Sequence, residues 1–544
     1  MDLGTATRGL TDGQSWTGPD GELADLALLP KAGRSKQPDG SSVVVGISGA
    51  RQNAAAAVAV DGRLEAFCEQ ERLTRIRRTT LTPGELPAEA VDAVLRLAGV
   101  SRESVTSYAT AERAAQLPRD LPEFRLDHHL AHAAAAYLTS PFDDAAVVVC
   151  DQHSTPQVSV WQGQGGRLHN ANWPWAGDAF AAIYSQCAAL FGLGPGQEHR
   201  LEALARLPLG SPPPAELEGC FGYADGHLHT VPDWKARVIG CLNAFGPAWP
   251  LPVGASVAAA IHRELGTHLL SFLSDVRSTL GLTSVCLGGG FFYNTYINAL
   301  VSQSGLFERT FVAPNPGNPG LATGAALSVN RRPGTPAQEV SPFLGPEYDL
   351  EQIKRTLDNC KLSYEWLSEH EVLERVVDAL VKGHLVGWFQ GRMEWGHRAL
   401  GNRSIVASPL SPFVLDNLNT YLKHRHLYRA YGLSVPEEDV DRFFAGPARS
   451  RWMEYDYQIR DEQAFVNVLP GQTRTLRVQT IPAASRQFHD LHRAFEATTG
   501  IPALINTSLN GFSEPIVCSP RDAVRVFFGT GLDLLVLGRF VIRK

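Results

Sequence analysis

Two buried strands, each followed by a hairpin, are the feature that most constrains how this chain can fold. Residues 43–48 (VVVGIS) form an uninterrupted apolar run, and so do residues 145–150 (AAVVVC), which lead directly into Asp151. Such runs are typical of strands that are buried in a sheet. A hairpin follows each run, because Asp61-Gly62 provides the positive φ angles of a tight turn and residues 157–169 (QVSVWQGQGGRLH) fold back on themselves. Together with helical patterns between them, these segments predict an α/β fold.

The length of the chain predicts more than one domain. At 544 residues it is too long for a single hydrophobic core. A Pro- and Gly-rich composition shift at residues 330–347 is the best candidate for a linker. We therefore expect a flexible tail over residues 1–41, a first domain over 42–335 and a second over 336–544.

Composition narrows the class of protein. The chain has 49 Lys+Arg against 56 Asp+Glu and a net charge of -7, which excludes a nucleic-acid partner held mainly by bulk electrostatics. Its 8 cysteines are scattered without a CxxC pair, as expected for buried thiols in a reducing compartment. The sequence has neither an apolar run of about 18 residues nor a basic-then-apolar leader, so we expect no membrane association and a cytoplasmic location.

The segment DHHLAHAAAAY (127–137) is a candidate metal-binding motif. Its alanine run predicts a helix, and on a helix His128 and His132 share one face and can bind one ion together. His129 points off that face, so we expect it to support the site or to be structural. Two histidines at this spacing are also common as packed or surface residues.

Two glycine loops follow predicted strands. They are SVCLGGGFFYN (284–294) and APNPGNPGLATGAAL (313–327). Glycine turns after strands let backbone N–H groups approach phosphates closely. Each loop is a weak signal by itself.

The C-terminal third is rich in cations that lie near apolar strands. Many such clusters are only solvated surface. Here they are interleaved with Gly, Asn and Ser in an acidic protein, which favours a pocket for a multiply anionic small molecule. The cations are Arg392, Arg398, Arg403, Lys423, Arg425, Arg429 and Arg477.

These motifs resemble a known family. The blocks FQGRMEWGHRALGNRSI, KHRHLYRAYGLSV, RVQT and LINTSLNGFSEPIVCSPRDAVRVF are similar to those of the ATP-dependent carbamoyltransferases that modify antibiotics and nodulation factors. The N-terminal segments stand in the order of that family too, and the resemblance runs from about Val43 to the C-terminus. It implies an actin/sugar-kinase-like (Kae1-like) domain followed by a YrdC-like α+β domain.

The resemblance also implies a reaction. The second domain would make carbamoyl-adenylate from ATP and carbamoyl phosphate, and the first would transfer the carbamoyl group to a hydroxyl or amine of a small natural-product acceptor. The residues expected to be catalytic are Arg398, Lys423 and Asp151. A divalent metal, Fe(II) in the family, would be held by His128, His132, Asp151 and Asn318.

The resemblance places the ATP and carbamoyl phosphate ligands on both glycine loops and on the cationic blocks. The expected cofactor-binding residues are Gly288, Gly289, Gly290, Asn294, Gly317, Arg392, Arg398, Asn402, Arg403, Lys423, Arg425, Arg429, Arg477, Asn506 and Ser508.

The chain departs from the family pattern in the first domain. Gln52 and Asn53 stand where a His-Asp or His-Asn pair is usual, and Asn318 replaces an aspartate. A neutral amide cannot accept a proton as histidine can, and it brings no charge to a metal. An alternative is therefore a diverged enzyme that uses ATP-dependent activation for another transfer, ligation or cyclisation, and a non-catalytic relative is a third possibility.

Other positions of the chain carry groups that the family pattern lacks. New titratable groups occur at His153, His199, His397 and His426.

Trp173 and Trp175 lie in a variable stretch that could form the acceptor pocket or pack between domains. Large chains of this type often pair as homodimers with twofold symmetry.

Overall fold

The computed structural model describes residues 41–49, 53–81, 85–111, 121–207, 214–244, 249–329 and 339–544. The predicted tail, apart from residue 41, and the predicted domain boundary at 335 and 336 lie outside these residues. We refer to residues 41–329 as the N-terminal region and to residues 339–544 as the C-terminal region. None of the helices in the described segments has the length and apolarity needed to cross a bilayer.

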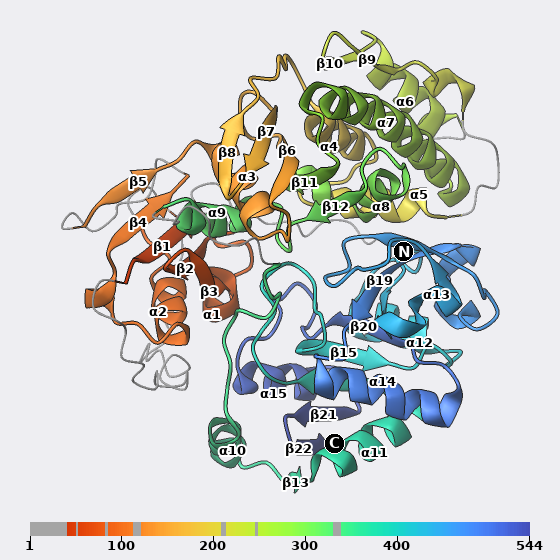
Figure 1. The fold of residues 1–544 in the computed structure, drawn as a ribbon. Helices are drawn as coiled ribbons and strands as arrows, with labels where there is room; N and C mark the ends of the chain where they lie inside the picture. Colours follow the sequence, from red (N-terminus) through yellow and green to blue (C-terminus); the bar gives the residue numbers. More distant parts are fainter. Residues whose placement is uncertain are drawn as a thin grey trace, which may run out of the picture.

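The N-terminal region contains two five-stranded sheets with the same topology (Figure 1). The first has the order β3-β2-β1-β4-β5 and the second β8-β7-β6-β11-β12. In each, the first three strands in the chain pair antiparallel and the last two join in parallel. The predicted strand-and-hairpin segments form the first three strands of each sheet. The duplication has no counterpart in the sequence, where no internal repeat is visible.

The strands of the N-terminal region are β1 (Val43–Ser48), β2 (Ala55–Val60), β3 (Arg63–Glu69), β4 (Ser107–Thr110), β5 (Glu123–Arg125), β6 (Asp144–Cys150), β7 (Val158–Gln164), β8 (Arg167–Asn170), β9 (Phe221–Ala224), β10 (His227–Thr230), β11 (Ser284–Gly288) and β12 (Arg309–Val312). Its helices are α1 (Gln70–Thr74), α2 (Ala88–Leu97), α3 (His128–Leu138), α4 (Phe180–Leu190), α5 (Glu198–Ala205), α6 (Trp234–Asn243), α7 (Leu251–Leu280), α8 (Thr295–Gln303) and α9 (Leu321–Ser328). Both hairpin turns have positive φ, at Asp61 and Gly62 and at Gly165 and Gly166.

Helices α3 and α9 lie between the two sheets and pack very closely (Figure 1). A Cβ on Gly324 of α9 would lie 1.9 Å from the carbonyl oxygen of Ala131 in α3. A Cβ on Gly46 of β1 would lie 1.9 Å from the carbonyl oxygen of Ala322. The alanine run of α3 and the small residues of α9 therefore serve backbone-to-backbone packing, which holds the site-bearing end of α3 in place.

The aromatic residues that could have formed an acceptor pocket are packed instead. Trp173 and Trp175 lie against Phe272 of the long helix α7, with ring centroids 5.6 and 5.4 Å away. The Trp173 indole donates a hydrogen bond to the Gly226 carbonyl. The tryptophans are therefore packed within the N-terminal region, and not between the two regions as the second alternative had it.

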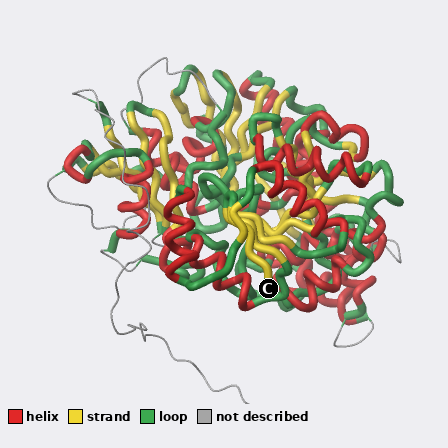
Figure 2. The backbone as a smooth tube through the Cα atoms, turned by 90° about the horizontal axis from the view of Figure 1, so that it is seen from below, coloured by secondary structure: helices red, strands yellow, loops and turns green. Residues whose placement is uncertain are grey.

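The C-terminal region is built on one ten-stranded mixed sheet in the order β13-β22-β21-β14-β15-β20-β16-β19-β18-β17. Only β14 with β21 and β16 with β19 pair in parallel. Helices α11 and α14 cover one face, where Leu380 and Phe495 pack with Trp388. Figure 2 shows the strands near the C-terminus gathered between helices.

The strands of this region are β13 (Glu365–Trp366), β14 (Val386–Phe389), β15 (Arg403–Ala407), β16 (Gly432–Pro436), β17 (Phe444–Ala445), β18 (Asp456–Ile459), β19 (Thr475–Ile481), β20 (Leu504–Ser508), β21 (Leu534–Leu537) and β22 (Phe540–Arg543). Its helices are α10 (Leu350–Asn359), α11 (Glu369–Val381), α12 (Val414–Asp416), α13 (Val440–Phe443), α14 (Arg486–Thr499) and α15 (Pro520–Gly529). The predicted fold class, α/β in the first part of the chain and α+β in the second, is confirmed.

Buried ion pairs join the two regions. Arg206 pairs with Glu202 of the N-terminal region and with Asp456 of the C-terminal region, where its Nε lies 2.6 Å from Oδ2. Near α1, Arg72 donates to the Gly396 carbonyl and Arg75 donates to the Ile516 carbonyl. Arg72 and Arg75, both within residues 69–78 (EQERLTRIRR), therefore help to hold the regions together.

Candidate functional site

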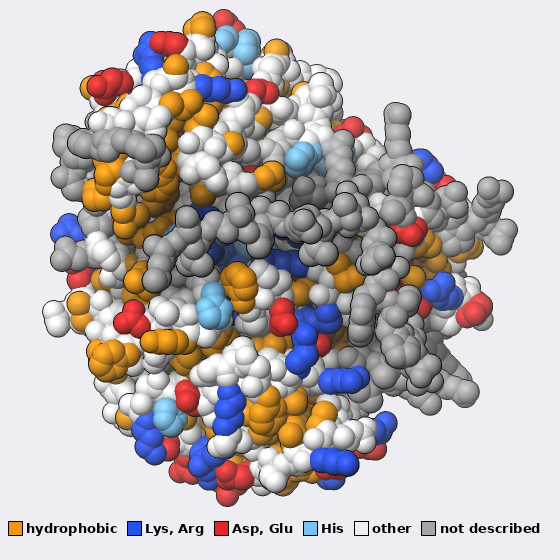
Figure 3. All heavy atoms as spheres, turned by 180° about the vertical axis from the view of Figure 1, so that it is seen from behind, with side chains coloured by type: hydrophobic (Ala, Val, Ile, Leu, Met, Phe, Trp, Pro, Cys, Tyr) orange, Lys and Arg blue, Asp and Glu red, His pale blue; other side chains and the backbone are white. Residues whose placement is uncertain are grey.

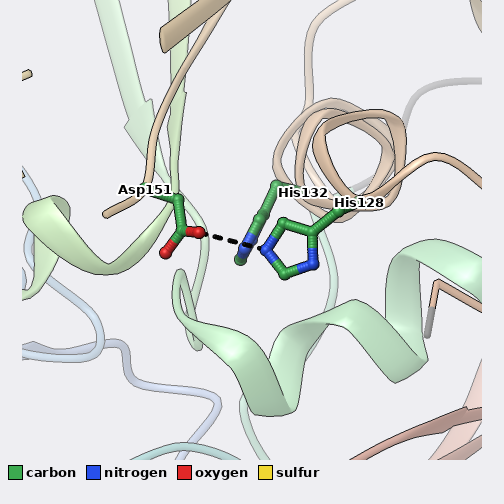
Figure 4. A group of neighbouring side chains, drawn as sticks. All are labelled: His128, His132 and Asp151. Carbon is green, nitrogen blue, oxygen red and sulfur yellow. Dashed lines mark hydrogen bonds and ion pairs between the residues drawn. The ribbon is translucent and has the colours of Figure 1, made fainter. Parts of the chain in front are cut away.

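Helix α3 and strand β6 bring the predicted metal ligands together (Figure 4). Asp127 caps α3 by accepting a hydrogen bond from the Leu130 backbone, so the helix begins at His128. His128 Nε2 lies 3.1 Å from Asp151 Oδ2, and the ligand atoms of His128, His132 and Asp151 lie within 4.8 Å of one another. Two imidazoles and a carboxylate form a donor set that suits first-row divalent metals, without distinguishing iron from zinc.

The environment keeps these groups in the protonation states that metal binding needs. Both ring nitrogens of buried His132 lack a hydrogen-bond partner among the described residues. Burial lowers the pKa of His132 to about 3, so the imidazole is neutral at physiological pH. Burial raises the pKa of Asp151, but the hydrogen bond from His128 and the nearby histidines outweigh it and hold that pKa below its usual range. An unpartnered buried imidazole next to an ionised carboxylate fits a divalent cation.

Asn318 lies on the loop that backs this cluster. It begins the short turn Asn318–Gly320, and the backbone of Pro316 lies next to the His132 ring. An amide oxygen there would be a neutral ligand for a hard ion. Its place as a fourth ligand stays a prediction.

His129 faces away from the cluster, as predicted. Its Nδ1 lies 2.6 Å from the Ser159 hydroxyl, and its Nε2 is hydrogen-bonded to the Ser154 hydroxyl. Ser154 in turn donates to Asp151 Oδ2 at 3.4 Å. Through these two serines, His129 therefore supports the loop that follows Asp151.

The glycine loops pack against the metal cluster. Gly289 has a φ of +96°, and a Cβ there would lie 2.2 Å from the Cys150 carbonyl. Its N–H donates to the Pro316 carbonyl at 2.8 Å, so the two loops are hydrogen-bonded together. A Cβ on Gly317 would strike the Tyr293 ring at 2.5 Å, and Asn294 caps α8. Close packing accounts for these residues, and phosphate binding by Gly288, Gly290 and their neighbours stays a prediction.

Three predicted arginines line a recess between the two regions. We define this basic recess by Arg398, Arg429 and Arg477. Its guanidinium groups form no ion pair with a described carboxylate: Arg398 makes one hydrogen bond of 3.4 Å to the Tyr293 carbonyl, Arg477 makes one of 3.4 Å to Ala430, and the Arg477 Nε has no partner. Figure 3 shows basic side chains in the recess between the two halves of the molecule.

Burial and neighbouring cations lower the pKa values of two arginines of the recess. Burial, followed by Arg398 and Arg206, lowers the pKa of Arg477 well below its usual range. Burial and Arg425 lower the pKa of Arg429 to about 10. Since arginine stays protonated at neutral pH, these shifts report a positive potential that a bound anion would relieve.

Three other predicted arginines have structural partners instead. Arg403 is fully buried, stacks 3.6 Å from the Phe389 ring centroid and donates to backbone carbonyls that include those of Gln390 and Pro346. Arg392 donates to the carbonyls of Glu65 and Leu344, and Arg425 to the Asn419 side chain. Their donors are engaged, so we leave these three out of the proposed phosphate site.

The remaining predicted ligands form a polar group beside the recess. Lys423 Nζ donates to the Ser508 carbonyl at 2.6 Å and to Asn510 Oδ1 at 2.7 Å. Asn402 donates to the Arg392 carbonyl, while buried Asn506 donates to Gln479 and keeps an unpartnered Oδ1. The structure thus brings Lys423 and Ser508 together.

Sequence reasoning missed two carboxylates that shape the site. Glu394 accepts hydrogen bonds from the backbone N–H groups of Leu400, Asn402 and Arg403, which fixes the loop that carries Arg398. Glu202 faces the recess from α5. Burial raises its pKa, but Arg206, Arg477 and Arg398 outweigh this and hold the pKa below its usual range. The only sequence signal for Glu394 was its place inside the GRMEWGHRALGNRS block.

Comparisons with known proteins find family profiles and relatives that match this chain. The family profile described as "Carbamoyltransferase C-terminus" matches residues 377–544, and "Carbamoyltransferase N-terminus" matches residues 247–327. An uncharacterised protein of Synechocystis is 32% identical over 81% of this chain and 80% of its own length. The nodulation protein NolO of Bradyrhizobium diazoefficiens is 31% identical over 77% of this chain and 79% of its own.

A more distant relative has a named activity. The 3'-hydroxymethylcephem-O-carbamoyltransferase of Amycolatopsis lactamdurans is 31% identical over 46% of this chain and 47% of its own length. Among solved structures, full-length HypF in its phosphate- and nucleotide-bound form covers 56% of each chain at 14% identity and a TM-score of 0.38.

Proposed function

The chain belongs to the carbamoyltransferase family, and on this basis we propose that it makes carbamoyl-adenylate from ATP and carbamoyl phosphate and transfers the carbamoyl group to a hydroxyl or amine of a small natural product. Such a reaction needs a site that binds the multiply anionic donor and a second site where the carbamoyl group is transferred to the acceptor. The basic recess and the His128–His132–Asp151 cluster are the candidates for these two sites.

The basic recess is the observation that carries the proposal. Three half-buried guanidinium groups that form no direct ion pair with a described carboxylate leave a positive charge that nearby Glu202 offsets only in part, and a bound anion would balance the rest. Guanidinium groups bind phosphate oxygens in bidentate fashion and stabilise the charge that develops as phosphate leaves. Arg398 is the residue we assign to that stabilisation. Lys423 was predicted to share it, but its Nζ donates to Ser508 and Asn510.

The metal cluster supports the transfer half. His128, His132 and Asp151 would hold a divalent cation, with Asn318 as a possible neutral ligand, and such an ion would polarise the carbamoyl carbonyl. Fe(II) is the ion that the resemblance implies. The loop contact between Gly289 and Pro316 places the glycine loops directly behind the cluster.

A nucleotide assay tests the proposal. Purified protein incubated with ATP and carbamoyl phosphate should release AMP and pyrophosphate, and with a suitable acceptor it should form a product heavier by one carbamoyl group. Arg398→Met should abolish the pyrophosphate signal. Arg474→Met is the matched control, because Arg474 directly precedes β19, the strand that carries Arg477, and its exposed side chain pairs with Glu462.

The outcomes separate the candidate functions. Nucleotide turnover that needs an acceptor and a donor other than carbamoyl phosphate would favour the alternative of a different ATP-dependent transfer, for which Asn318 in place of an aspartate is the motive. Absence of both turnover and nucleotide binding would contradict an enzymatic function.

A further inference from the structure

His397 is exposed toward the basic recess although protein surrounds it. It lies on the loop held by Glu394, next to Arg398, and its ring meets the Tyr293 ring edge-on with centroids 4.4 Å apart. Neither ring nitrogen is hydrogen-bonded to a described residue. A histidine with both nitrogens available at a ligand-facing position can take part in proton transfer.

The surroundings of His397 connect it to the metal cluster. A small pocket between the regions is lined by Tyr293, Pro314, Pro316, His397 and Arg398. Pro316 is the residue whose backbone lies next to the His132 ring. Pro316 therefore lies next to both His397 and the metal ligand His132, so one short loop connects the pocket of His397 with the metal cluster.

Other histidines near the site are engaged or turned away. His129 is hydrogen-bonded through both ring nitrogens to serines. His262 is buried and bonded to the Ala258 carbonyl and the Tyr184 hydroxyl. His426 lies near Arg429, but its Nε2 is bonded to Arg200 Nη2 at 2.7 Å. His199 on α5 also faces the recess, from the side of Arg429, and competes with His397 for the role.

We propose that His397 is the base that accepts the proton of the acceptor hydroxyl during carbamoyl transfer. This rests on the proposed function. The acceptor O–H bond breaks, its proton goes to a ring nitrogen of His397, and the oxygen forms a bond to the carbamoyl carbon. The bond between that carbon and the phosphate oxygen breaks, and its electron pair leaves with AMP. Gln52 and Asn53, which stand where the family has an acid-base pair, leave this task to another residue.

The arginines around His397 would make its pKa depend on whether an anionic donor is bound in the recess. Burial, followed by Arg398, Arg477 and Arg72, lowers the pKa of His397 well below 6.5, while Glu202 raises it. Tyr293 and Glu454 also line the pocket. An anion that neutralises the arginines removes the repulsion, so His397 becomes a stronger base only when the donor is present. This would limit proton transfer to the loaded site.

Nuclear magnetic resonance of the full-length protein tests this coupling without turnover. The protein is labelled with ¹³C at histidine Cε1, and His397→Gln identifies the resonance. We expect the pKa of His397 to rise by at least about one unit with saturating inorganic pyrophosphate or AMP, the effect of one opposite charge a few ångströms away. A pKa that neither probe changes would overturn the proposal.

Rapid-quench kinetics test the role in transfer, with water as the acceptor. The wild type should release a burst of about one pyrophosphate per chain and then turn over slowly. His397→Gln should keep the burst and lower the steady rate about 10²-fold or more, the usual effect of losing a general base. Loss of the steady rate in His199→Gln but not in His397→Gln would overturn the assignment. Absence of a wild-type burst would instead refute the proposed function, and the resonance experiment would still decide the coupling.

Discussion

Replacement of Asp456 by asparagine should weaken the junction between the two regions. The Asp456 carboxylate accepts from Arg206 Nε at 2.6 Å, from Arg206 Nη2 at 3.0 Å and from the Thr295 hydroxyl at 2.6 Å. The side chains of Arg206 and Asp456 are only 6% and 5% exposed, so solvent screens the pair little. Removing one partner of a buried ion pair costs about 3–5 kcal/mol. Because Glu202 still pairs with Arg206, we expect Asp456→Asn to lower the free energy of unfolding by about 3 kcal/mol, the lower end of this range.

Urea unfolding followed by tryptophan fluorescence measures this cost. A chain of this size need not unfold in one step, so the comparison is made on the first transition. The triple variant Glu202→Met/Arg206→Met/Asp456→Leu replaces all three charged groups with apolar side chains and should recover most of the loss, since apolar side chains need no polar partner. The proposed role of this ion pair would be refuted if Asp456→Asn left the midpoint of the first transition unchanged. It would also be refuted if the triple variant were less stable than Asp456→Asn.

Three further predictions concern the metal, the phosphate and the pH. His132→Ala should lower the affinity for divalent metal at least about 100-fold, and Asn318→Asp should raise it, both measured by calorimetry and elemental analysis; equal affinities would contradict the ligand assignment. Arg477→Met should weaken pyrophosphate binding by about 10–100-fold, and unchanged binding in equilibrium dialysis would remove it from the site. Burial raises the pKa of Glu454 to about 8 from its usual 4.5, so its contribution to stability is complete below 4.5 and is lost as the pH rises through 8. Glu454→Gln should therefore reduce the fall in unfolding free energy between pH 4.5 and 8. Parallel curves of unfolding free energy against pH for the wild type and the variant would contradict the raised pKa of Glu454.

Local sequence signals predicted the elements that depend on local chemistry. The turn at Asp61-Gly62 needs positive φ, and the structure has φ of 50° and 77° there. The helix of His128 and His132 and the strand before Asp151 were also found, because periodicity and buried runs are local. Their meeting followed from the resemblance, and the structure confirms it.

The roles of the individual arginines could not be read from the sequence. Arg398 and Arg403 lie in one short block, yet one faces the recess and the other donates to carbonyls within the core. What separates them is the set of partners that folding brings from distant parts of the chain. The pair of Arg206 and Asp456 was missed for the same reason, because its members are 250 residues apart.

The duplicated sheets and the tryptophans show the same limit. The two N-terminal sheets share strand order and direction without visible sequence similarity, because many apolar sequences satisfy the same buried strands. Trp173 and Trp175 suit a ligand or a core equally well, and only the position of Phe272 decides between them.

The exchange of labelled pyrophosphate into ATP tests the central claim most directly, because it detects reversible adenylation without an acceptor. The account predicts exchange that requires carbamoyl phosphate, is lost in Arg398→Met and persists in Arg474→Met. Exchange that is absent with the wild-type protein, or that proceeds equally well without carbamoyl phosphate, would contradict it.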